Sequence, residues 1–305
     1  MGSYIRIRKS HFPFLEEIPV YKKSSDDQYV LYKSDNVNLN SWFSKKDNLP
    51  DLYIPDTYRG YAIKKITESL NRDLYNQIKK HGLLEVKKIL ADLFNETLSE
   101  PKNVFLTCLP ETIELLFNSY SDNTDLIFKL SQVSANDNNF AEHSINVMFL
   151  VMNYGIHCKF SDSDVKKLSL MGLLHDIGKI RFPDFIRNPD HILSDDEFEI
   201  HKTHPILGHA ILKKQKEFDK SIALGVLEHH EKLDGSGYPK GIKNISFEGQ
   251  LLNIVNSFEQ LTYREKKYRK AKKPFDAMSI IKSEILKEGK FNKEIFTNLC
   301  MSFSS

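Results

Sequence analysis

Residues 173–180 read Leu-Leu-His-Asp-Ile-Gly-Lys-Ile, which places an imidazole and a carboxylate side by side at the end of an apolar run. The apolar positions before the pair follow helical spacing, so His175 is expected on the buried face of a helix starting near Ser163. A single buried histidine is more often a core residue bonded to a backbone carbonyl than a ligand. The positions that share the buried face are Leu168, Met171, Gly172 and His175.

The composition is that of a globular protein with one large or two ordinary domains. The chain has 305 residues, and 40% of them are hydrophobic, which is enough for a sizeable core. No apolar stretch reaches the roughly 18 residues of a membrane span, and the N-terminus has no apolar signal core, so we expect a cytoplasmic protein without a membrane partner. The net charge of +2 argues against a protein that coats a nucleic acid polymer. Three residues are expected to be reduced thiols in the core: Cys108, Cys158 and Cys300.

The first part of the chain, residues 1–60, predicts a small β-rich (α+β) domain. Short aromatic and β-branched runs alternate there with turn residues. Trp42 and Phe43 lie in a polar stretch and are either part of its core or an exposed contact. The runs expected to be strands are 18–21, 28–32 and 52–54.

From residue 61 the apolar period changes to that of helices. Residues 61–121 predict a helical linker, in which one helix stops at His81 and Gly82 and a second covers 83–98. Residues 122–305 predict an α-only domain. The fold class is therefore mainly α, with a small β-rich N-terminal domain.

Other histidines are also predicted on the apolar face of a helix, as His175 is. His143 lies on an apolar helical stripe, and His229 and His230 end an apolar helix. Five more histidines form no such constellation and are expected to be ordinary core or surface residues: His11, His81, His157, His191 and His209.

A capping box marks one further candidate. Ser194 and Glu197 fit the N-cap and third positions of a helix that we expect to carry both His201 and His204. His204 is the better inward candidate, because Gly208 leaves room for another helix beside it.

Together these positions supply imidazoles and one carboxylate from four predicted helices. Such ligands, without thiolate, suit iron, manganese or zinc, and a carboxylate between two groups of imidazoles can bridge two ions. One such histidine is ordinary, but five with an aspartate on inward faces favour a two-metal site in a helical bundle over separately satisfied side chains. The candidate ligands are His143, His175, Asp176, His204, His229 and His230.

Phosphoester hydrolysis is the natural reaction of such a site. Two ions about 3.5–4 Å apart can bridge a hydroxide that is nucleophilic at neutral pH, and can neutralise phosphate oxygens during in-line attack. Lys179, close to Asp176 in sequence, can stabilise charge on a nonbridging or leaving-group oxygen, which makes Lys179 and Asp176 the candidate catalytic residues. The alternative role of Lys179 is a charge at a helix C-terminus.

Residues 234–239, Asp-Gly-Ser-Gly-Tyr-Pro, predict a loop beside these ligands. Gly235 and Gly237 can free backbone N–H groups for a substrate, and Tyr238 offers an aromatic face and a hydroxyl. An ordinary tight turn is the alternative, because a glycine-rich loop alone is weak evidence.

The motifs around these residues resemble those of the HD-GYP family, a branch of the HD-domain phosphohydrolases. The resemblance covers about residues 125–285 and implies an HD-type helical bundle, with metal bound by the six candidate ligands and phosphate contacted by Lys179. It implies a two- or three-metal centre, often with iron or manganese, that hydrolyses the bacterial second messenger cyclic di-GMP to pGpG or GMP. The β-rich start followed by helices also resembles the adapter region of some members. The matching motifs are Glu142-His143-Ser144, His175-Asp176-Ile177-Gly178-Lys179, His204-Pro205-Ile206-Leu207-Gly208 and residues 229–239.

Three departures from the family pattern change what the resemblance implies. Asn139 stands where members with three metals carry a ligand glutamate, so we expect two divalent ions, with iron first and manganese or zinc as alternatives. Asn256 stands where the family has a metal-binding aspartate. Its amide oxygen can bind metal but brings no negative charge, so one ion is expected to be held more weakly. Glu259 also replaces a family aspartate.

A basic segment further on carries one residue more than the family's phosphate-binding segment. Lys266 and Arg269 are the best matches for phosphate contacts, Arg264 competes with them, and solvated charge is an equal alternative for each. The expected substrate contacts are Lys179, Gly235, Gly237, Tyr238, Lys266 and Arg269.

Two alternatives to a cyclic di-GMP phosphodiesterase stay open. The departures at Asn256 and Glu259 could leave a module that binds the dinucleotide and signals by contact. Catalysis could instead act on another cyclic dinucleotide or a nucleotide phosphate. The N-terminal domain has no receiver-like or nucleotide-binding motif, which favours contact with a protein partner or formation of a homodimer.

Overall fold

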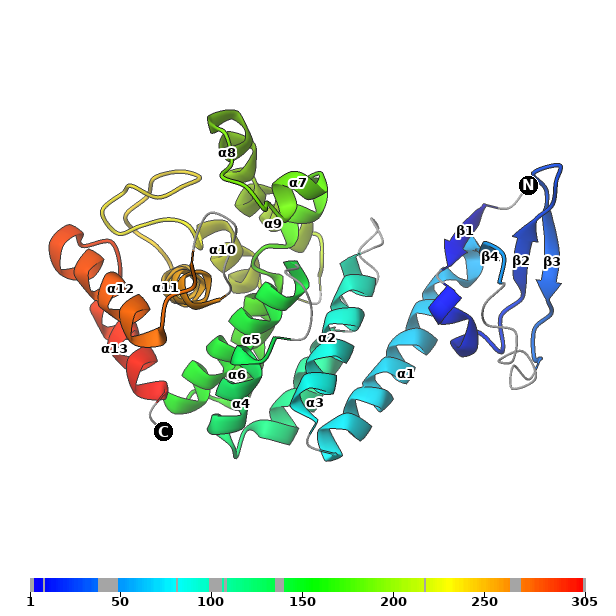
Figure 1. The fold of residues 1–305 in the computed structure, drawn as a ribbon, viewed down its shortest axis with the longest axis horizontal. Coiled ribbons are helices and arrows are strands. Elements are labelled where there is room, and N and C mark those ends of the chain that lie inside the picture. Colours follow the sequence, from blue (N-terminus) through cyan, green and yellow to red (C-terminus); the bar gives the residue numbers. More distant parts are fainter. Residues whose placement is uncertain are drawn as a thin grey trace.

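A small sheet at one end of the molecule is joined by a long helix to a helical bundle, as the computed structural model in Figure 1 shows. The structure describes residues 3–7, 9–37, 49–80, 82–98, 106, 109–134, 140–216, 218–263 and 270–303. The mainly α fold class with a small β-rich N-terminal part is confirmed.

The sheet has four antiparallel strands in the order β1-β4-β2-β3. The central strand β4 pairs with β1 on one side and with β2 on the other. The sequence pattern predicts the last three strands but not β1, which pairs with β4, a strand far along the chain. Trp42 and Phe43, predicted to be core residues or an exposed contact, lie outside the described residues. The strands are β1 (Tyr4–Ile7), β2 (Val20–Lys23), β3 (Tyr29–Lys33) and β4 (Leu52–Pro55).

The long helix α1 (Arg59–Lys79) contributes to two separate hydrophobic cores. Ala62 and Ile66, near its start, pack with apolar side chains of the sheet and of the 3-10 helix η1 (Lys9–Phe14). Leu74 and Ile78, near its end, pack into the core of the bundle. At 1.5 Å per residue the helix is about 30 Å long, which accounts for the distance between sheet and bundle in Figure 1.

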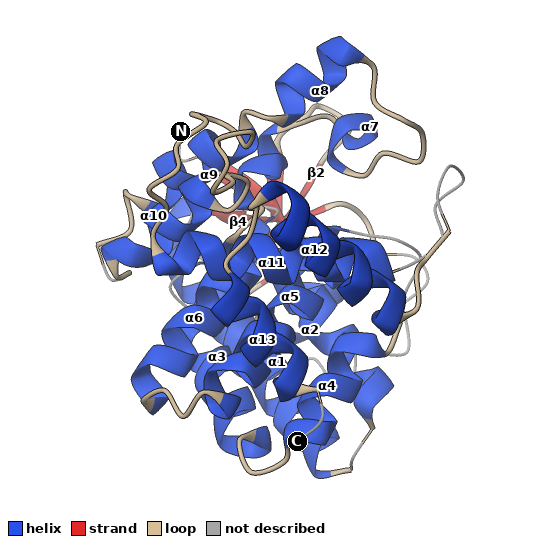
Figure 2. Ribbon diagram, turned by 90° about the vertical axis from the view of Figure 1, so that its left-hand side faces the viewer, coloured by secondary structure: helices blue, strands red, loops and turns tan. Residues whose placement is uncertain are grey.

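The bundle is built around α5 (Phe140–His157), which is buried on every face and is therefore its central helix. It packs against α2, α4, α6, α11 and α13, and Figure 2 shows the last helices of the chain in front of it. The elements before α5 are η4 (Asp56–Tyr58), α2 (Leu83–Leu98), α3 (Leu109–Tyr120) and α4 (Thr124–Gln132). Those after it are α6 (Asp162–Leu174), η6 (Ile177–Arg181), α7 (Asp184–Arg187), α8 (Asp195–His201), α9 (His204–Leu212), α10 (Lys220–Glu228), α11 (Phe247–Thr262), α12 (Pro274–Glu288) and α13 (Lys293–Ser302).

Two of the expected thiols are free cysteines, Cys158 and Cys300, which are only partly buried and pack against the core of the bundle. Cys108 lies outside the described residues. None of the helices in the described ranges combines the length and the apolar character that a membrane span requires.

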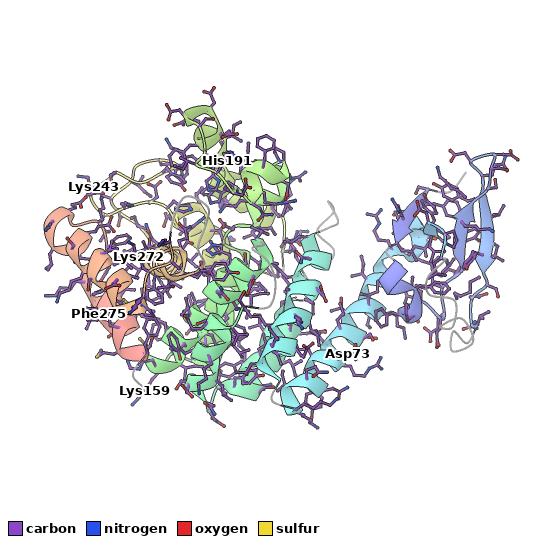
Figure 3. All side chains as sticks on the ribbon, in the orientation of Figure 1. Asp73, Lys159, His191, Lys243, Lys272 and Phe275 are labelled. Carbon is purple, nitrogen blue, oxygen red and sulfur yellow. The ribbon has the colours of Figure 1, made fainter. Side chains whose placement is uncertain are left out.

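Charged side chains mostly lie on the outside, as Asp73, Lys159 and Lys243 do in Figure 3. A buried charge is costly unless it is paired, so each exception marks a contact with a structural or chemical role. One exception is Lys87 of α2, whose ammonium lies 3.7 Å from Glu142 of α5 with both side chains fully buried. Lys87 also donates a hydrogen bond to the carbonyl of Val133. This ion pair ties α2 to the residue next to His143.

Methionine in place of Lys87 is expected to lower the free energy of unfolding by about 3–5 kcal/mol, because the buried carboxylate of Glu142 loses the ammonium that pairs with it. Urea unfolding followed by circular dichroism measures the change. The neighbouring Lys88 is exposed and pairs with Glu85, so Lys88→Met is the control and should change stability by about 0.5 kcal/mol or less. Equal stability of the two variants would show that the buried pair does not hold α2 in place.

Candidate metal centre

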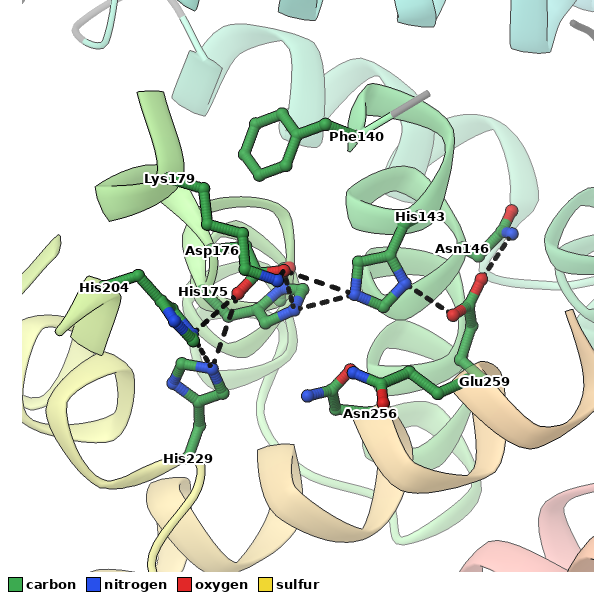
Figure 4. Close-up of polar contacts among 12 residues, drawn as sticks. Phe140, His143, Asn146, His175, Asp176, Lys179, His204, His229, Asn256 and Glu259 are labelled. Carbon is green, nitrogen blue, oxygen red and sulfur yellow. Dashed lines mark hydrogen bonds and ion pairs between the residues drawn. The ribbon is translucent and has the colours of Figure 1, made fainter. Parts of the chain in front are cut away.

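Four segments of the bundle bring the predicted ligands to one place (Figure 4). Each ligand lies within a turn of a helix end, so the packing of the helices sets its position. The contributions are His143 from the first turn of α5, His175 and Asp176 from the end of α6, His204 from the start of α9, and His229 and His230 from the end of α10.

Asp176 is fully buried between two groups of imidazoles and faces each group with a different oxygen. Its Oδ1 lies 3.1 Å from Nε2 of His204 and 3.6 Å from Nε2 of His229. Its Oδ2 lies 3.5 Å from Nε2 of both His143 and His175. This placement is that of a carboxylate able to bridge two ions.

Three of the imidazoles are oriented by the backbone. Each places Nδ1 against the carbonyl oxygen three residues earlier, and since a carbonyl only accepts, Nδ1 carries the hydrogen and Nε2 keeps its lone pair. All three lone pairs therefore point toward Asp176. The pairs are His175 with Gly172 at 2.8 Å, His204 with His201 at 2.6 Å, and His229 with Val226 at 2.7 Å.

The prediction that a single helix carries both His201 and His204 is wrong, because the chain forms α8 and α9 with a break between them. The physical reason is Pro205, which has no N–H to bond the carbonyl of His201. That carbonyl accepts Nδ1–H of His204 instead. The break therefore orients a candidate ligand, while the predicted capping box of Ser194 and Glu197 is confirmed.

His143 is oriented by a side chain rather than by the backbone. Its Nδ1 lies 2.5 Å from the carboxylate of Glu259 on α11, and Asn146 donates to the other oxygen of that carboxylate at 2.8 Å. Burial acts to lower the pKa of His143, but the charges of Glu259 and Asp176 outweigh it and raise the pKa to about 9. Glu259 thus holds the ring with Nε2 toward Asp176.

The other groups have the charge states that a metal site needs. Burial lowers the pKa of His204 to about 4 and holds those of His175 and His230 well below their usual value, so these rings are neutral near pH 7. Burial acts to raise the pKa of Asp176, but Lys179 and the imidazoles outweigh it, so its pKa lies well below the usual range and the carboxylate is charged.

The donor atoms fit two divalent cations. Nε2 of His204 lies 3.2 Å from Nε2 of His229 and 3.1 Å from Asp176, and lone pairs that converge at such distances repel one another unless a cation lies between them. Asp176 Oδ1 and His230 Nε2 are buried without a hydrogen-bond partner among the described residues. Two groups share the carboxylate: Asp176 with His204, His229 and His230, and Asp176 with His143 and His175.

Lys179 and Asn256 flank the second of these groups. Lys179 is buried and donates to Asp176 Oδ2 at 2.6 Å, so its ammonium lies at the edge of the centre. Asn256 is buried on α11 near His143 (Figure 4), and its side-chain oxygen accepts from Gln260 at 3.0 Å. Phosphate contact by Lys179 and metal binding by Asn256 stay predictions.

A cavity of about 460 Å³ opens beside the centre and reaches two of the predicted ligands, His230 and Asn256. Gly237 and Tyr238, both predicted substrate contacts, also line it. The full lining is Phe198, Lys202, His230, Lys232, Ser236, Gly237, Tyr238, Asn253, Asn256, Ser257 and Gln260.

The glycines of the loop have a structural role. A Cβ on Gly237 would lie 2.4 Å from the carbonyl oxygen of His230, so only glycine lets the loop approach the ligands this closely. Gly235 adopts φ 86°, which favours glycine, and its N–H bonds the carbonyl of Lys232 at 2.8 Å within a turn. The N–H of Gly235 is therefore already used, and a substrate contact there stays a prediction.

Several residues discussed in the sequence analysis are not placed at the centre. Asn139, Arg264, Lys266 and Arg269 lie outside the described residues. His191, expected to be an ordinary residue, lies near α7 and α8 (Figure 3), where it contacts Glu197 at 3.3 Å.

Sequence reasoning missed the residues that support the ligands. In the sequence Glu259 is recognisable only as the replacement of an aspartate in the family pattern, because its contact with His143 spans 116 residues. Glu231, directly after the paired histidines, is buried and accepts from the backbone N–H groups of Lys240 at 2.7 Å and Ile242 at 3.1 Å, which holds the loop in place. The available signal was a carboxylate next to ligand histidines in an apolar helix context.

A family model described as HD domain matches residues 121–292. The chain therefore belongs to the HD domain family, and the resemblance inferred from the motifs is confirmed.

Similarity to known proteins points to one branch of this family. A cyclic di-GMP phosphodiesterase of Thermotoga maritima is 28% identical over 242 residues, covering 78% of this chain and 59% of that protein. The cyclic di-GMP phosphodiesterase PdeB of Borreliella burgdorferi is 31% identical over 183 residues, covering 58% of this chain and 46% of that protein. The chain thus spans about half the length of these curated relatives.

The solved structure of Bd1817, described as a HDG"Y"P protein from Bdellovibrio bacteriovorus, matches with a TM-score of 0.64. The match covers 99% of this chain and 100% of that chain at 19% identity, which shows a shared fold.

Proposed function

We propose that the chain is a metal-dependent phosphodiesterase that hydrolyses cyclic di-GMP to pGpG or GMP. The observation that carries the proposal is Asp176, buried between two groups of imidazoles, with the Nε2 lone pairs of His175, His204 and His229 directed at its two oxygens. The relatives named as cyclic di-GMP phosphodiesterases support the choice of substrate.

In this proposal the six candidate ligands and Asn256 hold two divalent ions, iron first and manganese or zinc as alternatives. When bound, the ions supply a nucleophile from water at neutral pH and positive charge for the phosphate oxygens. The group with His143 and His175 would be completed by the neutral side-chain oxygen of Asn256. Its ion would therefore be held more weakly than the ion of the group with three imidazoles.

The remaining roles belong to the protein's own groups around the cavity. Lys179 directs its ammonium toward the phosphate and stabilises charge that develops on an oxygen. Tyr238 and Gly237 contact the nucleotide from the loop, and Glu259 keeps His143 in its ligand orientation. Lys266, Arg269 and Gly235 are proposed as further substrate contacts, and the N-terminal sheet as a contact for a protein partner or a second copy.

The test is cyclic di-GMP turnover by protein purified without oxygen, with the metal content determined on the same sample and manganese added in parallel. Hydrolysis with roughly two ions per chain supports the proposal. The matched control is His191→Ala, which removes a histidine outside the cluster and should leave metal content and rate unchanged. A protein that lacks bound metal and does not hydrolyse the dinucleotide, even with manganese added, contradicts it.

A binding module is the second candidate, favoured by the uncharged Asn256 in place of a carboxylate. Two bound ions and tight binding of cyclic di-GMP without product would select it over the enzyme. Asn256→Asp then restores the missing charge and shows whether that charge alone separates binding from turnover.

Methionine in place of Lys179 is expected to keep the bound metal and to lower the hydrolysis rate about 100-fold or more, because the ammonium beside Asp176 is lost while all ligands remain. Metal content and initial rates on the same preparation measure this. Arg181→Met, in the same 3-10 helix but exposed, is the control and should retain the rate. Loss of metal from Lys179→Met would instead assign Lys179 to holding the ligands together.

A further inference from the structure

The cavity beside the metal centre has the charge of a site for an anion. Its walls come from α8, from the loop after α10 and from α11. Lys202 and Lys232 both line it, and no carboxylate among the described residues does. The volume of about 460 Å³ lies within the range of roughly 300–1,000 Å³ that small-molecule sites occupy.

Two aromatic rings form a corner in this cavity. The rings of Phe198 and Tyr238 lie 6.2 Å apart between centroids at 78°. Tyr238 in turn stacks on His230, with centroids 4.5 Å apart, so the corner lies directly beside a candidate metal ligand. A flat ligand can pack against the face of one ring and meet the edge of the other. Phe198 is 42% exposed, which leaves apolar ring surface available to such a ligand.

The third wall offers neutral hydrogen-bonding groups. Its four residues follow the spacing of one helical face on α11, and they carry amides or a hydroxyl but no charge. Amides and hydroxyls match the mixed donors and acceptors on the edge of a nucleobase. The four residues are Asn253, Asn256, Ser257 and Gln260.

Cations, aromatic faces and neutral amides together match a nucleotide better than a simple phosphate ester. The ammonium of Lys202 lies 5.0 Å from the centroid of the Phe198 ring and pairs with the exposed carboxylate of Glu199 at 2.5 Å. Because an exposed ion pair contributes little to stability, a ligand phosphate can replace Glu199 as the partner of this ammonium beside the aromatic corner. Lys232 supplies a second charge from the loop. A ligand that packs its base in the corner can therefore place an anionic phosphate between these lysines and the metal ligands.

We propose that the corner formed by Phe198 and Tyr238 is a nucleobase subsite, and that Phe198 is the residue of this chain that determines affinity for the base. Lys202 and Lys232 neutralise the phosphate of the same nucleotide. That the base is guanine rests on the proposed function, whereas the subsite itself follows from the lining of the cavity.

The experiment compares binding of GMP with binding of ribose 5-phosphate, which lacks the base, by calorimetry on the full chain with its metals. Stacking of one base on an aromatic side chain is worth about 1–3 kcal/mol, so Phe198→Ala should weaken GMP binding about 5- to 140-fold. Binding of ribose 5-phosphate should not change. Phe198→Tyr should keep the preference for GMP, whereas Phe198→Leu, apolar but without a ring, should lose most of it.

Phe185→Ala is the matched control, because Phe185 is an exposed phenylalanine of α7 that does not line the cavity. It should bind GMP as the unmodified chain does. The subsite is overturned if Phe198→Ala keeps the full preference for GMP over ribose 5-phosphate, and a chain that still hydrolyses cyclic di-GMP would then leave the proposed function intact. If the chain shows no turnover but Phe198→Ala abolishes its preference for GMP, the subsite is supported. The proposed phosphodiesterase activity is then contradicted, and the subsite is not.

Discussion

Asparagine in place of Asp176 is expected to remove bound metal and phosphodiesterase activity together. Asp176 is the carboxylate shared by both groups of candidate ligands found among the described residues, and asparagine keeps its shape without its charge. In the two-ion site proposed above, the metal content should fall to about one ion per chain or fewer. Turnover should fall at least about a thousandfold, because the loss of charge stabilisation raises the activation free energy of hydrolysis by about 4 kcal/mol.

Elemental analysis and initial rates of cyclic di-GMP hydrolysis on the same preparation measure both effects. Asp184→Asn is the control, since Asp184 is an exposed aspartate that pairs with Arg187 at the surface and should be dispensable. An Asp176→Asn protein that keeps both ions would mean that the carboxylate does not bridge them.

Alanine in place of Gly178 is expected to separate η6 from α9 and to disturb the centre indirectly. The added Cβ would lie 2.0 Å from the carbonyl oxygen of His204 and 2.7 Å from the backbone nitrogen of Gly208. Both are backbone atoms, so no side chain can rotate away and α9 must move. We expect the free energy of unfolding to fall by about 3 kcal/mol, and metal affinity to fall because His204 moves with α9.

Urea unfolding in the presence of a chelator separates this loss of stability from the loss of metal, since bound metal itself stabilises the folded state. Gly60→Ala is the control: Gly60 is also helical, its Cβ would meet nothing within 4 Å, and alanine there should be neutral or stabilising by up to about 1 kcal/mol. Equal stability of the two variants would show that the contact between η6 and α9 can relax freely.

The sequence predicts those parts of the molecule whose signals are local. The helix expected at 83–98 is confirmed as α2, because an unbroken apolar period follows directly after Gly82. The inward direction of His175 is likewise confirmed, since helical spacing alone sets which face a side chain occupies.

Other features depend on contacts that no local pattern reveals. Strand β1 exists through its pairing with β4, and the His143–Glu259 contact joins helices 116 residues apart in sequence. The break before α9 was in principle predictable from Pro205, but the capping box upstream gave a continuous helical pattern that concealed it. Packing therefore decides how the ligands are supported, even though their identities are visible in the sequence.

The way the imidazoles are held suggests where this centre can change during evolution. His175, His204 and His229 take their orientation from main-chain carbonyls, so substitutions around them cannot easily retune those rings. His143 alone among the four depends on a genetically replaceable group, Glu259, and the same helix carries Asn256. Substitutions on α11 can therefore reorient a candidate ligand, whereas the rings of His175, His204 and His229 are held by the main chain of the fold itself.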